Sequence, residues 1–484
     1  MLNTDILKQN KLPLLLAFLS VLFYFAFAYN LIRTNYIKLI TLYTTLFFVF
    51  YKLVLLLKTH IVFLTWLAFA FRTVFILAIP NLSQDFYRFI WDGRMILEGF
   101  NPYLYTVESF IKNGNFPVAQ AQELYKGMGE LNASHFTNYP PINQLCFIFA
   151  ALFASKSILG SVIVMRLLII AADFGILHFG KKLLKKLKIP VYNIFWYILN
   201  PFIIIELTGN LHFEGVMIFF LIWSLYILHI EKWYFASIVL GLSISVKLVP
   251  LIFLPLFFRW FTKQNVIKNE MNQSVSVEKT ASVLPSSNDK KKWIPAFTGM
   301  PNLLIFYSLT GLTILFLFTP FYSKILINNY IKTIALWFQD FEFNASLYYI
   351  AREVGYLFRG YNEILIIGKA IPALVILFVL IITFFKKNKS TADLITSMLF
   401  VLSFYYFIAT TIHPWYVATL LILSIFTNYK FPLVWSFAII LSYLAYLNSN
   451  NTETLWVIGF EYLIVYSVFI WEVFINKKAM KSIS

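Results

Sequence analysis

The chain has 484 residues, of which 60% are hydrophobic, 19% aromatic and only 13% charged, and its formal net charge is +17. With a mean hydropathy of +0.75, it has more apolar surface than a water-soluble fold can bury, which excludes a soluble globular enzyme and a disordered chain. The apolar residues form unbroken runs instead of short alternating strands, so an all-α polytopic membrane protein is predicted and a β-barrel is disfavoured.

Apolar runs close to the roughly 20 residues that cross a bilayer recur along the chain. They lie at 12–29, 39–57, 61–80, 158–180, 191–208, 213–230, 302–322, 362–385, 391–412, 431–447 and 455–475. Shorter runs, interpreted as thin crossings, re-entrant pieces or broken helices, lie at 142–155, 234–248, 249–261 and 415–428. We therefore expect about 12 to 14 transmembrane helices.

Basic residues cluster in loops between these runs, so the positive charge reports membrane topology and predicts no nucleic-acid partner. The clusters expected on the cytoplasmic side lie at 8–11, 181–188, 259–292, 386–389 and 477–481. The segments expected on the external side are 81–141, 209–214, 323–360 and His413. The run at 142–155 is interpreted as re-entrant or interfacial, because a full crossing there would place the cluster at 181–188 outside.

Composition divides the chain into three parts. Residues 1–261 are expected to form an N-terminal transmembrane module that carries the long first external loop at 81–141. Residues 262–301 are rich in Gln, Asn, Ser and Lys, which predicts a flexible cytoplasmic loop and an insertion, because few apolar residues there offset the entropy of ordering. Residues 302–484 are expected to form a C-terminal transmembrane module.

The densest group of ionisable residues opens the first external loop, in the sequence QDFYRFIWDGR at 84–94. Ionisable groups at a membrane surface are functional candidates because burying them is costly. On a helix, Asp85 and Arg88, and likewise Arg88 and Asp92, share one face and are spaced for ion pairs. Spacing alone leaves open an interfacial amphipathic helix whose ion pairs are solvated.

Further polar residues interrupt apolar sequence on the same expected side. Lys247 lies at a predicted helix break, where it either binds a phosphate or snorkels to the interface. His413 follows the run at 391–412 and either donates to a phosphate or belongs to the interfacial aromatic belt. His212 and Glu214 share a short turn, but two ligands without a third at matching spacing do not make a zinc site.

The sequence DFYRFIWDGR at 85–94, followed by GFNPY at 99–103 and NYPPINQL at 138–145, resembles the opening of GT-C glycosyltransferases. The likeness is to bacterial mannosyltransferase-like members that use a polyprenyl-phosphate-linked sugar. Segments that agree with it in order lie at 209–215, 245–250, 341–349 and 413–416, so that the resemblance spans residues 80 to 420 and only 262–301 looks foreign.

The resemblance implies a multi-pass, GT-C-like enzyme whose active site lies at the outer membrane face, with Asp85 as the catalytic base. A leaving lipid phosphate requires cationic or hydrogen-bond donor groups, for which the candidates are Arg88, Arg94, Lys247, Arg352 and His413. The candidates for positioning the sugar or the acceptor are Asp92, Asn210, His212, Glu214, Glu342, Asn344, Tyr348 and Tyr416. No metal or other cofactor is expected, although a divalent metal is not excluded.

Together these features predict an inverting hexosyltransferase in the inner (plasma) membrane, with mannose as the first choice of sugar. Its expected partners are the lipid bilayer, a polyprenyl-phosphate-linked donor, and an envelope glycan, glycolipid or protein as acceptor on the external or periplasmic face. One alternative is a flippase or transporter of lipid-linked saccharide, which would carry charges near the bilayer midplane and paired half-repeats. Another is an O-antigen ligase or polymerase, which would depend on Arg and His in a large late external loop.

Overall fold

The computed structural model describes residues 11–262, 300–339, 341–386, 388, 390–447 and 452–476. The structure is 78% helical, and the described residues contain no strand, which confirms the all-α prediction. Extended segments of these residues meet at an isolated bridge between Phe343 and Thr411. The polar loop predicted at 262–301 lies outside the described residues, apart from its two ends.

Among the described residues, seven helices are long and apolar enough to cross a bilayer. They are α2 (Lys11–Asn30), α3 (Tyr36–Leu57), α9 (Ile158–Lys186), α15 (Met300–Phe318) with η4 (Thr319–Phe321), α18 (Ile364–Phe385), α19 (Thr391–Ile408), and α22 (Leu455–Ile470) with η7 (Trp471–Ile475). An eighth span results if the pair Val191–Ile198 and Pro201–Gly209, bent by 48°, is counted as one. The chain is therefore a multi-pass membrane protein, but the expected 12 to 14 crossings are not confirmed.

The remaining apolar helices are shorter than a bilayer crossing requires. They are α4 (Ile61–Thr73), α8 (Pro141–Ala154), α12 (Glu214–His229), α13 (Trp233–Ile244), η3 (Val249–Leu256) continuing to Thr262, η5 (Pro414–Tyr416) with α20 (Val417–Ser424), and α21 (Phe431–Ala438) with η6 (Ile439–Leu447). A straight helix of 14 residues is about 21 Å long, whereas the hydrocarbon core is about 30 Å thick. The predicted run at 61–80 is thus only partly helical.

The other helices are short or polar. The bent pair consists of η1 (Val191–Ile194), α10 (Phe195–Ile198), α11 (Pro201–Ile203) and η2 (Ile204–Gly209). The polar helices are α5 (Asp85–Leu97), α6 (Val107–Lys112), α7 (Ala121–Ser134), α16 (Lys324–Gln339) and α17 (Leu347–Arg359).

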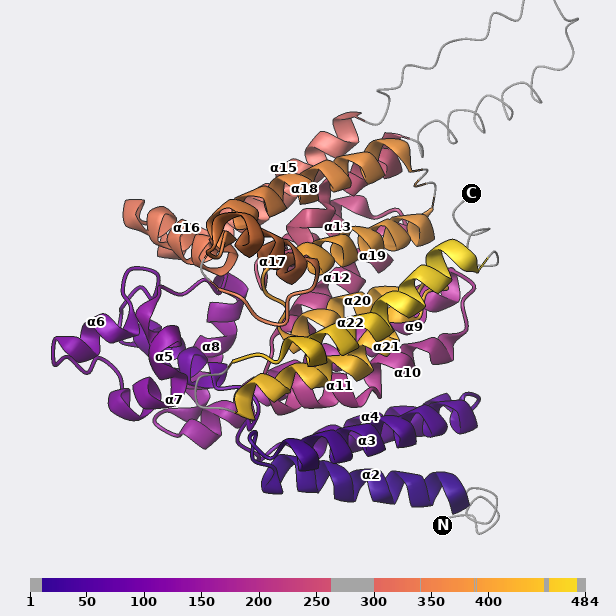
Figure 1. Cartoon of the computed structure of the whole chain (residues 1–484), viewed down its shortest axis with the longest axis horizontal. Coiled ribbons are helices and arrows are strands. Elements are labelled where there is room, and N and C mark those ends of the chain that lie inside the picture. The colour runs from indigo at the N-terminus through magenta and orange to yellow at the C-terminus, as the bar shows by residue number, and fades with distance from the viewer. Residues whose placement is uncertain are drawn as a thin grey trace, which may run out of the picture.

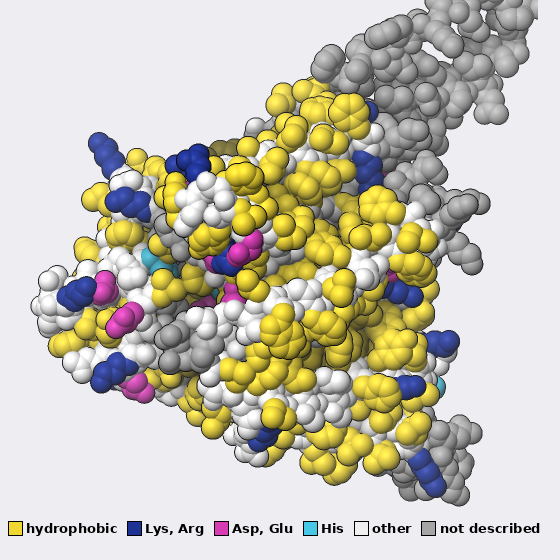
Figure 2. All heavy atoms as spheres, in the orientation of Figure 1, with side chains coloured by type: hydrophobic (Ala, Val, Ile, Leu, Met, Phe, Trp, Pro, Cys, Tyr) yellow, Lys and Arg dark blue, Asp and Glu magenta, His cyan; other side chains and the backbone are white. Residues whose placement is uncertain are grey.

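The long helices run side by side, and α5, α6, α7 and α8 gather with α16 at one end of them, on the left in Figure 1. Helices α2, α3 and α4 form one edge of the molecule, and α15 and α18 lie at the opposite edge (Figure 1). Figure 2 shows mostly hydrophobic side chains along the long helices and Lys and Arg side chains at both ends of them, accompanied by Asp and Glu at the end of α5 and α6. Exposed hydrophobic side chains of this kind fit contact with lipid.

Close packing of α5 on α8 explains the glycine of the first-loop motif. A Cβ atom added at Gly93 would lie 2.2 Å from the carbonyl oxygen of Phe147, so only glycine permits this approach without a backbone shift. The rings of Phe89 and Phe147 stack at a centroid distance of 4.6 Å across the same contact. The helix that begins at Asp85 is therefore held firmly against the bundle.

A buried ion pair joins α4 to α9. The Nε atom of Arg72 donates to Oδ2 of Asp173 at 2.7 Å, and neither side chain is exposed. Arg72 also donates to the carbonyl oxygens of Ala68 and Ile198, at 2.9 and 2.8 Å. This pair was not predicted from the sequence, because nothing local connects two residues so far apart in the chain.

We expect the Arg72→Met variant to lose about 3–5 kcal/mol of unfolding free energy, because it leaves the Asp173 carboxylate buried without its partner. Thermal unfolding in detergent should show a lower midpoint than for the wild type. The double variant Arg72→Met/Asp173→Leu serves as the control, since it removes both charges and should recover most of the loss. Equal stability of the single and double variants would contradict this role.

Candidate active site

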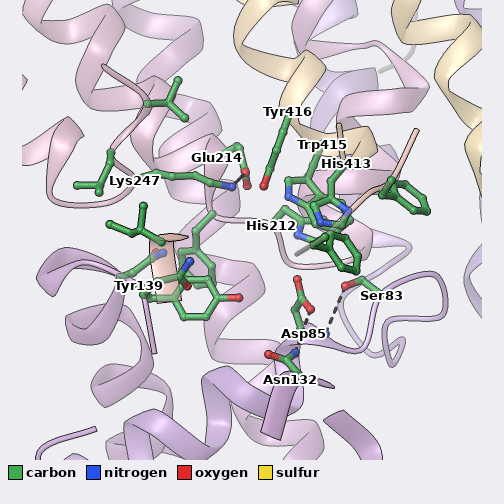
Figure 3. Close-up of a pocket in the computed structure, with 18 of the residues that line it drawn as sticks. Ser83, Asp85, Asn132, Tyr139, His212, Glu214, Lys247, His413, Trp415 and Tyr416 are labelled. Atoms are coloured by element: carbon green, nitrogen blue, oxygen red, sulfur yellow. Dashed lines mark hydrogen bonds and ion pairs between the residues drawn. The ribbon is translucent and has the colours of Figure 1, made fainter. Parts of the chain in front are cut away.

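A cavity of about 1080 Å³ collects side chains from segments spread over most of the chain. Its wall includes residues of the α2–α3 loop, α5, α7, α8, the turn before α12, the α13–η3 turn, α18 and the turn before η5. Predicted site residues that line it are Asp85, His212, Glu214, Lys247, Glu342, His413 and Tyr416. Segments expected on one side of the membrane thus meet at one site, part of which is shown in Figure 3.

Asp85 is the first residue of α5, where the helix dipole favours a carboxylate. Its Oδ1 atom accepts a hydrogen bond from Nδ2 of Asn132 at 3.3 Å, and its backbone N–H donates to Oγ of Ser83 at 3.3 Å. Burial raises the pKa of Asp85 to about 6, with a further increase from Glu214, while Lys247 and the Asn132 hydrogen bond oppose the rise. A carboxylate with this pKa is suited to accept a proton near neutral pH.

Lys247 provides a cation on the cavity wall. It follows the end of α13, as the predicted helix break requires, and its Nζ atom donates to Oε1 of Glu214, the first residue of α12. The same Nζ atom lies 4.5 Å from the centroid of the Tyr416 ring. Figure 3 shows the Lys247 side chain extended toward Glu214 and Tyr416. The ammonium group is therefore held at the cavity and does not snorkel away to the interface.

Three aromatic rings stack on another part of the wall (Figure 3). The indole of Trp415 lies between two imidazoles, with centroid distances of 3.6 Å to His212 and 4.7 Å to His413. The rings are nearly parallel, at interplanar angles of 18° and 6°. The stack therefore joins the turn before α12 to the start of η5, although the two segments are far apart in the chain.

The turn that carries His212 is held by a buried arginine and contains a strained residue. Arg166 of α9, which is fully buried, donates to the carbonyl oxygens of Thr208 and Gly209 at 2.8 and 2.9 Å. Leu211 has a φ of +64°, a left-handed conformation that costs a non-glycine residue about 1–2 kcal/mol. Strain of this kind often marks functional sites, because the surrounding structure must maintain it.

Asn210 serves this same turn and does not line the cavity. Its Oδ1 atom accepts from the backbone N–H of Leu82 at 3.1 Å, and its Nδ2 atom donates to the carbonyl oxygen of Ile205 at 3.2 Å. The residue thus ties the His212 turn to the segment before Asp85. The sequence suggested Asn210 as a sugar contact, and the structure places its side chain outside the cavity wall.

Arg88 and Asp92 form the predicted i,i+4 ion pair at 2.8 Å, but both side chains are only 1% exposed. The alternative of a surface helix with solvated ion pairs is therefore wrong for this pair. Arg88 also donates to the carbonyl oxygens of Asn132 and His135, at 2.7 and 3.1 Å, and so holds the end of α7 near Asp85. Arg88 and Asp92 do not line the cavity.

Arg94 also lies away from the cavity wall. It donates to the carbonyl oxygen of Ala119 at 2.7 Å and to Oε1 of Gln120 at 3.2 Å. These contacts connect α5 to the segment that leads into α7. Arg94, like Arg88, therefore makes contacts that hold the first loop together, and neither of these suggested phosphate ligands lines the cavity.

Glu342 is held at the cavity by a polar cluster of the C-terminal half. It accepts hydrogen bonds from Tyr348 and Asn362 and pairs with Nη1 of Arg352 at 2.6 Å. Tyr348 and Arg352 do not line the cavity themselves. The cluster keeps the carboxylate of Glu342 in place, and it engages the Arg352 cation that the sequence suggested for phosphate binding.

Asn344 lies two residues after Glu342 and does not line the cavity. Its backbone N–H donates to Oε1 of Glu453 at 2.7 Å, and its Nδ2 atom donates to Oε1 of the buried Glu461 at 3.2 Å. The neighbouring Phe343 bonds through its N–H and carbonyl groups to Thr410 and Ile412, next to His413. The structure therefore gives Asn344 a position beneath the wall, where it anchors the segment that carries Glu342.

Sequence reasoning missed Asn132, Ser83 and Trp415 as parts of the site. Trp415 belongs to the 413–416 motif. Asn132 lies in the polar helix α7, where no sequence pattern marks it, and it contacts Asp85 only because of the fold. Within the described part of the chain, no group of three or more His, Cys, Asp and Glu side chains is arranged to hold a metal ion.

The pKa of His413 provides a test of this geometry. Burial, assisted by the positive charge of Lys247, lowers it to about 3, so the imidazole should stay neutral at every pH above about 4. NMR spectra of histidine-labelled protein in detergent should contain a His413 ring signal that does not move between about pH 5 and 8, besides that of His212, whose pKa burial also lowers. The His413→Gln variant assigns that signal, and a shift of the assigned signal in this range would contradict the buried position.

Comparison with known proteins gives one family. Residues 25–263 match the family model described as alpha-(1->6)-mannopyranosyltransferase, N-terminal domain. The match includes α5, α7, α8, Lys247 and the turn with His212, and hence most of the N-terminal part of the cavity wall. No curated protein matches the chain.

Proposed function

We propose that this chain, which belongs through residues 25–263 to the alpha-(1->6)-mannopyranosyltransferase family of GT-C-type membrane mannosyltransferases, transfers a hexose from a polyprenyl-phosphate donor to an envelope acceptor. The chain is an enzyme, a glycosyltransferase, on the strength of that family. Mannose is the first choice of sugar, and the acceptor is a glycan, glycolipid or protein. The transfer inverts the configuration of the sugar carbon.

The observation that carries this proposal is the meeting of three chemical features in one cavity. Asp85 offers a carboxylate whose pKa of about 6 suits a general base. Lys247 offers a cation that can stabilise a phosphate. The wall next to Lys247 is apolar, with Val249 and Ile252 on η3 and Val375 on α18.

The apolar wall also suits the tail of a lipid donor. Leu251 and Ile376 line the cavity and are 39% and 60% exposed, so that hydrophobic side chains continue from the cavity to the surface beside α18. A prenyl chain needs a continuous apolar path of this kind into the bilayer. A water-soluble sugar nucleotide would gain little from it, and this favours the polyprenyl-phosphate donor.

In the proposed reaction, an acceptor hydroxyl oxygen attacks the anomeric carbon of the donor and forms the new glycosidic bond. Asp85 takes the hydroxyl proton, and the bond from the anomeric carbon to the phosphate oxygen breaks with its electron pair on the leaving phosphate. Lys247, oriented by Glu214, stabilises the charge on that phosphate. An inverting transfer that makes an α-linkage requires a β-linked donor sugar.

The acceptor is proposed to approach from the α7 side of the cavity. Gln84, Glu130 and Asn132 line this side, and Gln84 and Glu130 are exposed to solvent. Amide and carboxylate groups are suited to bind the hydroxyls of a saccharide. Asn132 also contacts Asp85, so that an acceptor bound here would present its hydroxyl to the base.

The proposal includes the orientation in the inner membrane. The basic cluster at 181–188, which includes the last turn of α9, is assigned to the cytoplasmic side by the positive-inside rule. The cavity then faces the periplasm or exterior. We further propose that residues 1–261 and 302–484 form two transmembrane modules and that residues 262–301 between them lie on the cytoplasmic side. The shorter apolar helices are proposed to complete 12 to 14 crossings in pairs or in broken spans.

We expect the Asp85→Asn variant to lose several orders of magnitude in transfer rate, because the amide keeps the shape of the side chain and removes the base. The measurement is transfer of radiolabelled hexose from synthetic polyprenyl-phosphate donors to a membrane lipid extract by protein purified in detergent. Glu98→Gln, the same chemical change at an exposed residue that ends α5, is the matched control and should keep its activity.

An active Asp85→Asn variant would exclude Asp85 as the base. If neither wild type nor variant transfers sugar from any donor, while both move a lipid-linked saccharide across liposomes, the protein is a flippase and the proposal fails.

The pH dependence of transfer should report the carboxylate. Since the pKa of Asp85 is raised to about 6, the base form is lost as pH falls through this value. We expect kcat/KM to be level above about pH 7 and to fall tenfold per pH unit below about pH 6. Asn132→Ala removes a hydrogen bond that lowers this pKa, so its profile should shift to higher pH. A profile that is flat from about pH 5 to 8 would contradict the assignment.

A further inference from the structure

The start of α8 brings to the cavity a polar side chain that the proposed mechanism does not use. Asn143 lines the cavity and is only 3% exposed. Its Oδ1 atom is a buried acceptor without a hydrogen-bond partner, and no other described residue bonds to its side-chain amide. Leaving such a buried group unsatisfied is costly, so its presence indicates a ligand.

The position of Asn143 is fixed by the fold. It is the third residue of α8, after Pro140 at the N-cap and Pro141 at the first helical position. The backbone N–H of Ile142 donates to the carbonyl oxygen of Ser245 at 2.9 Å, which ties the start of α8 to the turn that carries Lys247. Asn143 therefore stands on the donor side of the cavity, next to the segment proposed to bind the phosphate.

The chemistry of the side chain indicates what it binds. An amide offers an acceptor oxygen and a donor NH₂ group side by side. A phosphate accepts hydrogen bonds only and would leave the Oδ1 atom unpaired. Neighbouring hydroxyls of a pyranose can donate to the oxygen and accept from the nitrogen at the same time, and so satisfy both ends of the amide.

We propose that Asn143 binds hydroxyl groups of the transferred hexose and determines which sugar the enzyme accepts. This inference rests on the proposed function, since it assigns the sugar next to the phosphate that Lys247 binds. The inference gives a role to the NYPPINQL sequence, because the two prolines begin α8 at the cavity and Asn143 binds the sugar hydroxyls.

The test uses a mannosyl donor with a short prenyl phosphate and its 2-, 3-, 4- and 6-deoxy analogues. Wild-type enzyme should lose about 10- to 100-fold in kcat/KM with the analogue that lacks a hydroxyl bound by Asn143. In Asn143→Ala, kcat/KM for the intact donor should fall by a similar factor, and removal of the same hydroxyl should have almost no further effect. The ratio of kcat/KM for the intact donor to that for the deoxy analogue thus drops to about one.

Matched controls separate this role from a structural one. Asn193→Ala makes the same change at a half-buried residue away from the cavity and should keep the wild-type ratio at every position. If Asn143→Ala does not fold, Asn143→Asp keeps the size of the side chain and removes its donor, and should lower the same ratio. Wild-type discrimination at all four hydroxyls in the Asn143 variants would overturn the inference, because the amide would then hold only water.

Failure of the proposed function would be recognised separately, by a wild type that transfers hexose from no donor. Asn143 is then tested by binding, with mannosyl phosphate and its deoxy analogues as probes in thermal-shift measurements. Stabilisation of the wild type that is lost both with one deoxy analogue and in Asn143→Ala supports the sugar contact. Equal stabilisation of wild type and variant, or none of either, overturns it.

Discussion

The site depends on one buried guanidinium, that of Arg166. Arg166 of α9 donates to the carbonyl oxygens of Thr208 and Gly209, which precede the His212 turn, and to that of Ile76, which precedes the loop to Asp85. Helices that end inside a membrane protein leave carbonyl groups that lipid cannot satisfy. By satisfying three of them, Arg166 lets α4 and η2 stop short and brings both loops to the same place.

The broken helices explain why charged and apolar side chains can line the same cavity. A carboxylate, an ammonium group and an apolar wall meet because Asp85, Glu214 and Lys247 each stand at a helix end, while η3 and α18 bring hydrophobic side chains beside them. The Lys247–Glu214 pair keeps the cation at the cavity, and burial keeps the Asp85 carboxylate basic. The start of α8 adds the amide of Asn143 to the same cavity.

Several residues that looked alike in the sequence have different positions in the fold. Asp85 and Asp92 share one face of α5, yet Asp85 lines the cavity and Asp92 is closed off in a pair with Arg88. Lys247 and Arg352 both pair with carboxylates, but of these two cations only Lys247 lines the cavity. Spacing along a helix predicts which side chains share a face, and the neighbouring helices decide what that face meets.

The sequence by itself determined the all-α membrane class, through long apolar runs, and the first-loop motif with Asp85, through local patterns that survive any packing. It also indicated the helix break at Lys247, because a charged residue followed by proline ends an apolar helix. Only the tertiary structure decided that Asn132 touches Asp85, that Trp415 lies between His212 and His413, and that Arg72 pairs with Asp173. These contacts join residues far apart in the chain, and the packing of helix on helix is what brings them together.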